Sequence, residues 1–275
     1  MARSQKARGL KAGRARGESP RARHKGRLLK ALGGLFAVAA VSGLAVYLFV
    51  AFADDEATGP RTAAIVDQLS LTQPNSSFAE EATSILEDAG YQVDYYTGGQ
   101  VTVEFYRDLP THGYDLLILR VHSGLARDNG KPTGYVSLFS GEPFSETKYV
   151  QEKAAGLVGR ASYYDGSPQV FGIVPEFIQS SMRGRFDGAT VVMLGCDGLI
   201  TDTTAEAFVL KGAKTVVGWS GRVSAEHTDA AAEHLLQHLL ADGLSTEGAV
   251  ARTMAEVGPD PVYGSVLRLY PPEGG

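Results

Sequence analysis

Two side chains that could perform nucleophilic and acid–base chemistry directly follow apolar segments of this 275-residue sequence. His122 follows segment 116–121, Cys196 follows segment 191–195, and each has a glycine within the next two residues. A thiol needs a base to become a nucleophile at neutral pH, and imidazole is the usual one. Glycine lets backbone N–H groups approach a developing oxyanion. The alternative is that Cys196 is a small buried hydrophobe and His122 an ordinary loop residue.

The segments that must position this pair alternate between apolar runs typical of strands and the three-to-four-residue apolar spacing typical of helices. Strands are predicted over 63–69, 91–96, 114–121, 190–195, 215–219 and, as a closing edge strand, 262–270. Helices are predicted over 78–89, 103–109, 175–182, 203–211, 225–241 and 245–257. This alternation indicates an α/β fold with a mainly parallel sheet and helices on both faces. Ligands of such sheets bind beyond the carboxyl ends of the strands, where neighbouring strands lie about 4.8 Å apart.

Residues 62–275 are long enough for one domain, which a short linker at 54–61 precedes. A segment rich in Gly, Ser and Tyr, residues 125–172, interrupts the alternation. Within it, Asp165-Gly166 lies between two short apolar runs and predicts a hairpin. We therefore expect a loop and hairpin insertion in this part of the domain.

The net charge of −5 is the sum of two opposite charges. Residues 1–30 hold eleven basic and one acidic side chain, a net +10, which leaves fifteen basic and thirty acidic side chains, a net −15, on the rest. An apolar content of 44% excludes a disordered protein, and a single cysteine excludes an intrachain disulfide and a Cys-based structural zinc site. The basic arm has no interleaved aromatic residues, so no nucleic-acid partner is expected.

An uncharged segment of 23 residues, 31–53, separates the two charges. As a helix it would span about 34 Å, enough to cross the bilayer core. The Lys/Arg excess of residues 1–30 predicts a single-pass membrane protein with a cytoplasmic N-terminus and an extracytoplasmic C-terminal domain. One alternative is a cleaved signal peptide, since 51–53 resembles an A-x-A site, but the apolar run is long for one. The inverted topology would place the domain in a reducing cytosol, and the charge asymmetry argues against it.

The apolar segments that end at His122 and Cys196 make the chain resemble the caspase-like cysteine peptidases, which include caspases, metacaspases, gingipains, legumains, separases and the CHAT domain. In that group one apolar strand ends in the catalytic His, usually followed by Gly, and a later one ends in the catalytic Cys. The resemblance covers about residues 61–257. Segment 212–219, followed by a helix and 242–245, is similar to the CHAT-type continuation. The resemblance implies a caspase-like three-layer sandwich.

The resemblance also implies roles for individual residues. Cys196 would attack a peptide carbonyl, and His122 would take the thiol proton and pass it to the leaving amine. The oxyanion would be held by the N–H of Cys196 and by that of Ser123 or Gly124. The chain departs from the group here, because it has His-Ser-Gly where the group usually has His-Gly.

A substrate pocket is implied near Asp197 and the Trp219-Ser220 loop. If the Asp197 carboxylate points inward, it favours a basic residue before the cleaved bond, but we favour the alternative that Asp197 turns the chain. The substrate would be a peptide or protein, and no cofactor is needed.

Three histidines, at 227, 234 and 238, share one stripe of the predicted helix 225–241. They do not form the H-E-x-x-H pattern, so we predict a solvated helix face and no metal. The sequence thus predicts a membrane-anchored caspase-like cysteine endopeptidase that uses a Cys–His dyad. The competing hypothesis is a catalytically inactive caspase-like domain that acts as a cell-surface binding module, favoured by the altered His-Ser-Gly and by a lone thiol on an oxidising side.

Overall fold

The computed structural model describes residues 59–128 and 130–272. They belong to a compact unit that begins at Gly59. The predicted basic arm 1–30 and the predicted transmembrane segment 31–53 lie outside the described residues. Among residues 59–128 and 130–272, no helix is both long enough and apolar enough to cross a bilayer.

A six-stranded sheet, sheet A, contains the two candidate catalytic strand ends. Its strands are β1 (Arg61–Asp67), β2 (Tyr91–Thr97), β3 (Leu116–Arg120), β8 (Thr190–Met193), β9 (Thr215–Trp219) and β10 (Leu267–Tyr270). Their order is β10-β9-β8-β3-β1-β2, and every pair is parallel except β10 with β9. All six strands were predicted from the sequence, and the mainly parallel α/β class is confirmed. Leu119 pairs with Met193, so His122 and Cys196 each lie three residues beyond the last paired residues of adjacent strands.

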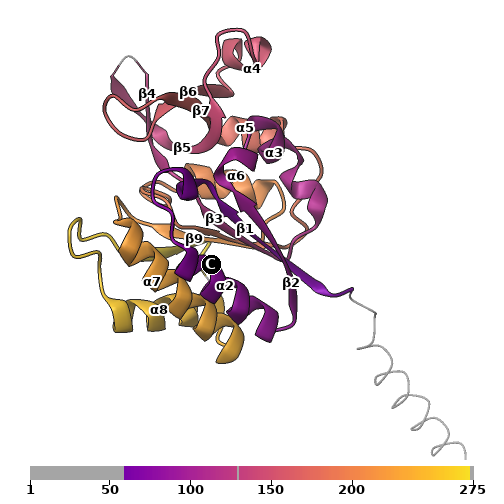
Figure 1. Ribbon diagram of the computed structural model, residues 1–275, viewed down its shortest axis with the longest axis vertical. Helices are drawn as coiled ribbons and strands as arrows, with labels where there is room; N and C mark the ends of the chain where they lie inside the picture. The colour runs from indigo at the N-terminus through magenta and orange to yellow at the C-terminus, as the bar shows by residue number, and fades with distance from the viewer. Residues whose placement is uncertain (1–58, 129, 273–275) are drawn as a thin grey trace, which may run out of the picture. The chain divides into compact units, whose positions relative to one another are not determined.

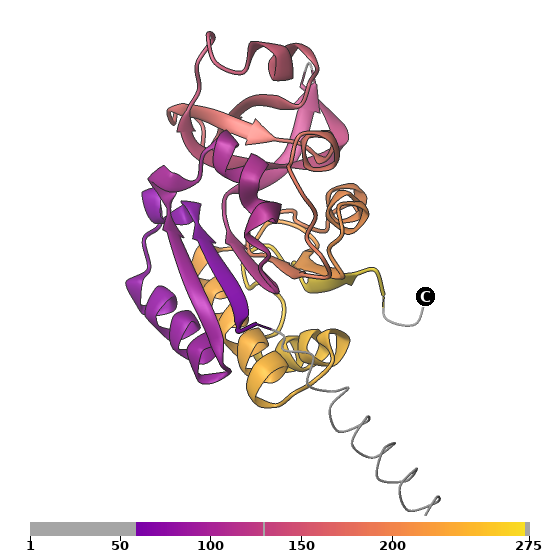
Figure 2. The same cartoon turned by 90° about the vertical axis from the view of Figure 1, so that its right-hand side faces the viewer.

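Helices cover both faces of sheet A (Figures 1 and 2). One face is covered by α2 (Ser76–Asp88), α7 (Ala225–Leu236) and α8 (Thr246–Val257), and the other by α3 (Val103–Asp108), α5 (Pro175–Ser180) and α6 (Thr203–Leu210). Strand β1 shows why, since Ala63 and Ile65 pack into one core while Ala64 and Val66 pack into the other. A strand that is apolar on both sides requires cover on both sides.

The segment predicted as an insertion folds into a second sheet, sheet B, near the carboxyl ends of the sheet A strands (Figure 1). It contains β4 (Ser123–Asp128), β5 (Lys131–Pro143), β6 (Val158–Ser162) and β7 (Gln169–Ile173), antiparallel in the order β4-β5-β7-β6, with the short helix α4 (Val150–Ala154) between β5 and β6. The predicted hairpin is observed as β6 and β7. The sequence did not predict β4 and β5, because the pairing of β5 with β7 joins segments about thirty residues apart.

The predicted long helix 225–241 is interrupted. Helix α7 ends at Leu236 and continues as one π-helical turn, η4 (Gln237–Ala241). The predicted solvated histidine stripe is wrong at His238, which is only 6% exposed. The reason is that α8 packs beside α7, so His238 faces Glu256, while His227 Nε2 lies 3.2 Å from the Gly258 carbonyl oxygen.

Candidate active site

His122 and Cys196 line one small cavity of about 40 Å³ at the carboxyl edge of sheet A. The other lining residues are Leu69, Gln73, Leu194, Gly195, Val223, Ala225 and Thr228. The two reactive groups have other partners: the Cys196 thiol donates to the Val223 carbonyl oxygen at 3.5 Å, and His122 Nε2 lies 2.8 Å from Thr72 Oγ1. The structure therefore brings the predicted pair to one site but places no hydrogen bond between thiol and imidazole among the residues it describes.

His122 is held by three contacts, one through its backbone and two through its ring. Its backbone N–H donates to Gln68 Oε1 at 2.8 Å, its Nε2 meets Thr72, and its ring stacks on Tyr163 with centroids 4.8 Å apart. Burial and the nearby positive charge of Arg120 lower the pKa of His122 to about 4. The imidazole is therefore neutral at neutral pH, the form that can accept a proton.

The Cys196 thiol is protonated at rest. Burial, with a contribution from the charge of Asp197, raises its pKa above the ordinary value. A protonated thiol is a weak nucleophile, so chemistry at this site needs a base to remove the proton. Glycine before Cys196 is required for packing, because a Cβ at Gly195 would lie 2.2 Å from both the Val121 carbonyl oxygen and Ser123 Oγ.

Ser123 stands where the caspase-like group usually has the glycine after histidine, and it links the segments that follow β3 and β8. Its hydroxyl donates to the Cys196 carbonyl oxygen at 2.6 Å. The N–H of Phe139 donates to the His122 carbonyl oxygen, and Ser123 pairs with Leu138. Antiparallel pairs alternate in hydrogen bonding, so the Gly124 N–H faces β5 and the Ser123 N–H faces the open edge of β4.

The remaining backbone donors agree with this assignment. The Leu125 N–H, two residues along the same edge, reaches Asp197 Oδ2 at 3.4 Å, which shows that this edge faces the segment after β8. The Cys196 N–H donates no hydrogen bond to any residue that the structure describes. Of the three predicted oxyanion donors, those of Ser123 and Cys196 are thus available and that of Gly124 is directed into sheet B.

The three predicted pocket residues have structural partners. Asp197 adopts a left-handed backbone (φ 64°), donates its N–H to the Gly221 carbonyl oxygen and directs its carboxylate to β4, as expected for a residue that turns the chain. Trp219 is fully buried, and its Nε1 donates to Thr228 Oγ1 at 2.8 Å. Ser220 bonds through its N–H and its hydroxyl to Val266. None of the three lines the cavity shared by His122 and Cys196.

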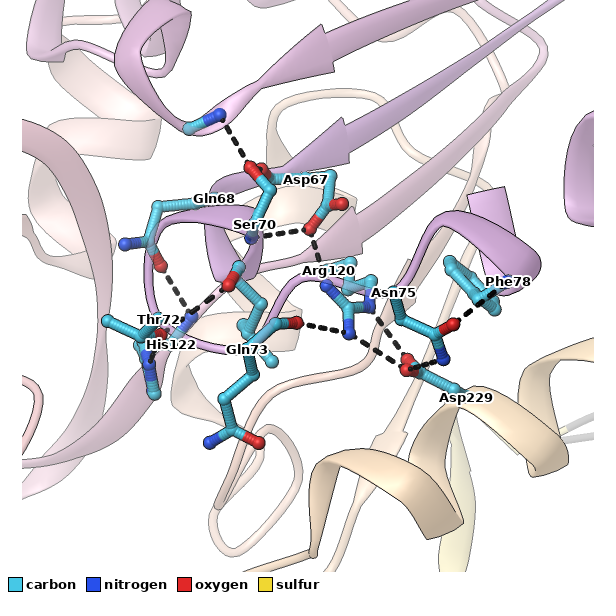
Figure 3. A network of polar contacts seen from close by, with 12 residues as sticks. Asp67, Gln68, Ser70, Thr72, Gln73, Asn75, Phe78, Arg120, His122 and Asp229 are labelled. Carbon is cyan, nitrogen blue, oxygen red and sulfur yellow. Dashed lines mark hydrogen bonds and ion pairs between the residues drawn. The ribbon is translucent and has the colours of Figure 1, made fainter. Parts of the chain in front are cut away.

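A buried charge cluster lies beside this cavity (Figure 3). Arg120, the last residue of β3, is 0% exposed and donates from Nε and Nη2 to both carboxylate oxygens of Asp229, at 2.7 and 2.8 Å. Its Nη1 donates to Asp67 at 2.7 Å. Burial lowers the pKa of Arg120, but hydrogen bonds and charges from Asp229 and Asp67 outweigh it and raise the pKa. The guanidinium is therefore permanently charged and fully paired.

The same cluster holds the segment that supports His122. Arg120 Nη2 also donates to the Gln73 carbonyl oxygen at 3.0 Å, and Asp67 accepts from the Ser70 N–H. Gln68 and Thr72, which contact His122, lie within this segment, the first in the 3-10 turn η1 (Gln68–Leu71). The charge cluster thus fixes segment 68–73, and that segment fixes the imidazole.

Sequence reasoning missed Gln68, Thr72 and Tyr163, because nothing in their spacing relates them to His122. Arg120 carried a signal: it is a charged residue within the apolar strand segment 116–121. A charge at such a position is costly unless it is paired, so it predicts a buried ion pair.

No protein-family model matches the chain, and no curated protein matches it in sequence. Among solved structures it is similar to the crystal structure of the Arg-specific cysteine proteinase gingipain R, with 9% identity and a TM-score of 0.44 over 72% of this chain and 43% of that one. The chain thus spans less than half the length of that structure.

Removal of the Arg120 charge is expected to destabilise the domain strongly. In Arg120→Met, Asp67 and Asp229 stay buried without their cation, which costs about 3–5 kcal/mol of unfolding free energy. Urea unfolding of the full-length chain measures this loss. The control is Arg183→Met, whose guanidinium pairs with Glu104 and Asp108 at the surface and is 58% exposed. A loss in Arg120→Met no larger than in this control would contradict the structural role of the cluster.

Stability should depend on pH through His122. Its folded pKa of about 4 lies below the ordinary value of 6.5, so the unfolded chain binds the proton first. The stability advantage of the wild type over His122→Gln should therefore shrink as the pH falls from about 6.5 to about 4, by about 2 kcal/mol after allowance for solvent screening. Urea unfolding of both chains across this range is the measurement. A constant or growing difference would show that the pKa is not lowered.

Proposed function

We propose that this chain is a membrane-anchored, caspase-like cysteine endopeptidase that uses Cys196 as nucleophile and His122 as general base. The observation that carries the proposal is that the two residues, 74 positions apart, line one cavity at equivalent points of adjacent parallel strands. The two available N–H donors support it. The imidazole is unprotonated, as a base must be, but a pKa of about 4 makes it a weak base in the closed site, so substrate binding would have to raise that pKa.

The proposed reaction follows from these groups. The Cys196 sulfur bonds to the substrate carbonyl carbon as its proton moves to His122, and the N–H groups of Cys196 and Ser123 stabilise the oxyanion. Collapse of this intermediate breaks the C–N bond, and the imidazolium gives its proton to the leaving amine. Water then attacks the thioester with His122 as base, which releases the carboxylic acid and restores the thiol.

Catalysis by this site requires a local rearrangement. A cavity of about 40 Å³ is too small for a peptide segment, and both reactive groups are bonded elsewhere. Substrate binding would have to open the cavity between segment 68–73 and Val223, and would have to free the imidazole from Thr72. Catalytic hydrogen bonds are often long in free enzymes and shorten when substrate binds.

The small closed cavity, with both reactive groups bonded elsewhere, favours the second candidate, an inactive caspase-like domain that serves as a binding module. If the closed arrangement is permanent, Cys196 and His122 are structural residues that hold strand ends together. The two candidates differ in whether a substrate-like electrophile can reach the thiol with the help of the imidazole.

Labelling with peptidyl chloromethyl ketones separates them. The full-length chain is treated with reagents that carry arginine or an uncharged residue next to the warhead, and adducts are mapped by mass spectrometry. We expect displacement of chloride by the Cys196 sulfur, no adduct in Cys196→Ala, and a rate roughly 100-fold lower in His122→Ala, since general-base assistance contributes on that order.

Iodoacetamide serves as the control for simple access to the thiol. Alkylation of Cys196 by iodoacetamide without labelling by either peptide reagent supports the inactive binding module. If the rate of labelling by the peptide reagents is unchanged in His122→Ala, His122 does not activate Cys196 and the proposed dyad is wrong.

The membrane anchor and the location are part of the proposal and rest on the sequence. The uncharged segment 31–53, the +10 arm before it and the −15 chain after it support an inside-to-outside orientation. The proposed partners are accordingly the lipid bilayer, through residues 31–53, and an extracytoplasmic peptide or protein substrate.

Alkaline phosphatase fused to the C-terminus tests this topology, because it is active only after export. We expect an active reporter in the membrane fraction, and reduced activity when the eleven basic residues of 1–30 are replaced by Gln. An inactive reporter on the native chain would overturn the orientation. A soluble active product that lacks about 53 residues would instead show a cleaved signal peptide.

A further inference from the structure

A cluster of metal-ligating side chains lies outside the candidate active site, where η4 meets α8. It consists of His234 near the end of α7, His238 in η4 and Glu256 near the end of α8, with one potential ligand atom from each within 4.8 Å of the others. His238 is about 15 Å along the helix from Thr228, which lines the cavity. The proposed peptidase chemistry does not use these residues.

Two of the three distances between the ligand atoms are close to those of a tetrahedral metal site, and the third, between the two imidazole nitrogens, is within 4.8 Å. Glu256 Oε2 lies 3.1 Å from His234 Nδ1 and 3.1 Å from His238 Nε2. Ligands about 2.0–2.2 Å from a tetrahedral centre are about 3.4 Å apart, so these two edges need to open by only a few tenths of an ångström. Two histidines four residues apart share one helix face, and π-helical turns such as η4 often occur at functional sites.

Both ring nitrogens of His238 face a carboxylate oxygen. Its Nδ1 lies 2.7 Å from Asp242 Oδ2 while its Nε2 lies 3.1 Å from Glu256 Oε2. A divalent cation between Nε2 and Glu256 Oε2 would be bonded by both atoms, while Nδ1 would keep its hydrogen bond to Asp242.

Neighbouring side chains are placed to orient the proposed ligands. Asp242 accepts from the nitrogen of His238 that does not face the site, which is the usual way in which a ligating imidazole is oriented. Arg252 Nε donates to the other oxygen of Glu256 at 2.6 Å. His234 and Glu256 are 42% and 30% exposed, so a fourth position is open to water.

We propose that His234, His238 and Glu256 bind a divalent transition-metal ion of the zinc type. Two imidazoles and one carboxylate suit such ions and do not suit Mg²⁺ or Ca²⁺, which prefer oxygen ligands. The ion would connect α7 and η4 to α8 and would stabilise the packing of these helices. Helix α7 also carries Asp229, which pairs with Arg120.

Zinc titration of the chelator-treated full-length chain tests the site. We expect saturating Zn²⁺ to raise Tm by roughly 5 °C or more, with Co²⁺ giving visible absorption typical of a bound ion and Mg²⁺ giving no shift. The shift should be lost in His234→Ala and in Glu256→Gln, and Asp242→Asn should weaken binding roughly tenfold or more.

His227→Ala is the matched control, because it removes a histidine from the same helix that is not part of the cluster. It and Cys196→Ala should keep the full zinc shift, the second because the ion does not bind at the candidate active site. The alternative is a charged His238 bonded to both carboxylates without a metal. If Zn²⁺ does not shift the Tm of the wild type, or shifts the Tm of both ligand variants by the same amount as that of the wild type, the proposal is rejected and this alternative is favoured.

Discussion

The buried charge of Arg120 is the constraint on which the site depends. A guanidinium at the end of a central strand must be paired, and here two carboxylates from distant parts of the chain do so, Asp67 at the end of β1 and Asp229 in α7. Their convergence fixes the edge of sheet A, helix α7 and segment 68–73 together (Figure 3). Because that segment carries Gln68 and Thr72, the orientation of the imidazole is a consequence of how one buried cation is paired.

The candidate site is assembled from both sheets. The ends of two sheet A strands lead into the two reactive residues, while sheet B supplies the free edge of β4, and the turn after β6 supplies the ring of Tyr163. Ser123 links the two sheets, because it is the first residue of β4 and its hydroxyl donates a hydrogen bond to the Cys196 carbonyl oxygen. The His-Ser-Gly sequence, which departs from the usual His-Gly of the caspase-like group, thus gives the chain a side-chain link between the two strand ends.

The electrostatics of the site bear on the compartment that we propose for it. A free thiol on an oxidising side is vulnerable mainly as a thiolate. Burial raises the pKa of Cys196 and keeps the thiol protonated, and the same burial lowers the pKa of His122 and keeps the imidazole neutral. A resting site without an ion pair is therefore compatible with exposure to oxidants, and thiolate would form only when the base acts on it.

The sequence alone determined the strands of sheet A, its mainly parallel class and the candidate pair at two of its strand ends. Apolar periodicity is local, and a reactive residue after an apolar run lies at a strand end whatever the rest of the chain does. The six strands of sheet A and the β6–β7 hairpin were predictable for that reason. Sheet B as a whole, the direction of the Ser123 and Gly124 N–H groups, the burial of Trp219 and the cover over His238 were decided by tertiary structure. Each depends on which other segment packs against it: Ser123 pairs with Leu138, and His238 faces Glu256. Apolar periodicity is a property of each segment alone and does not specify these partners.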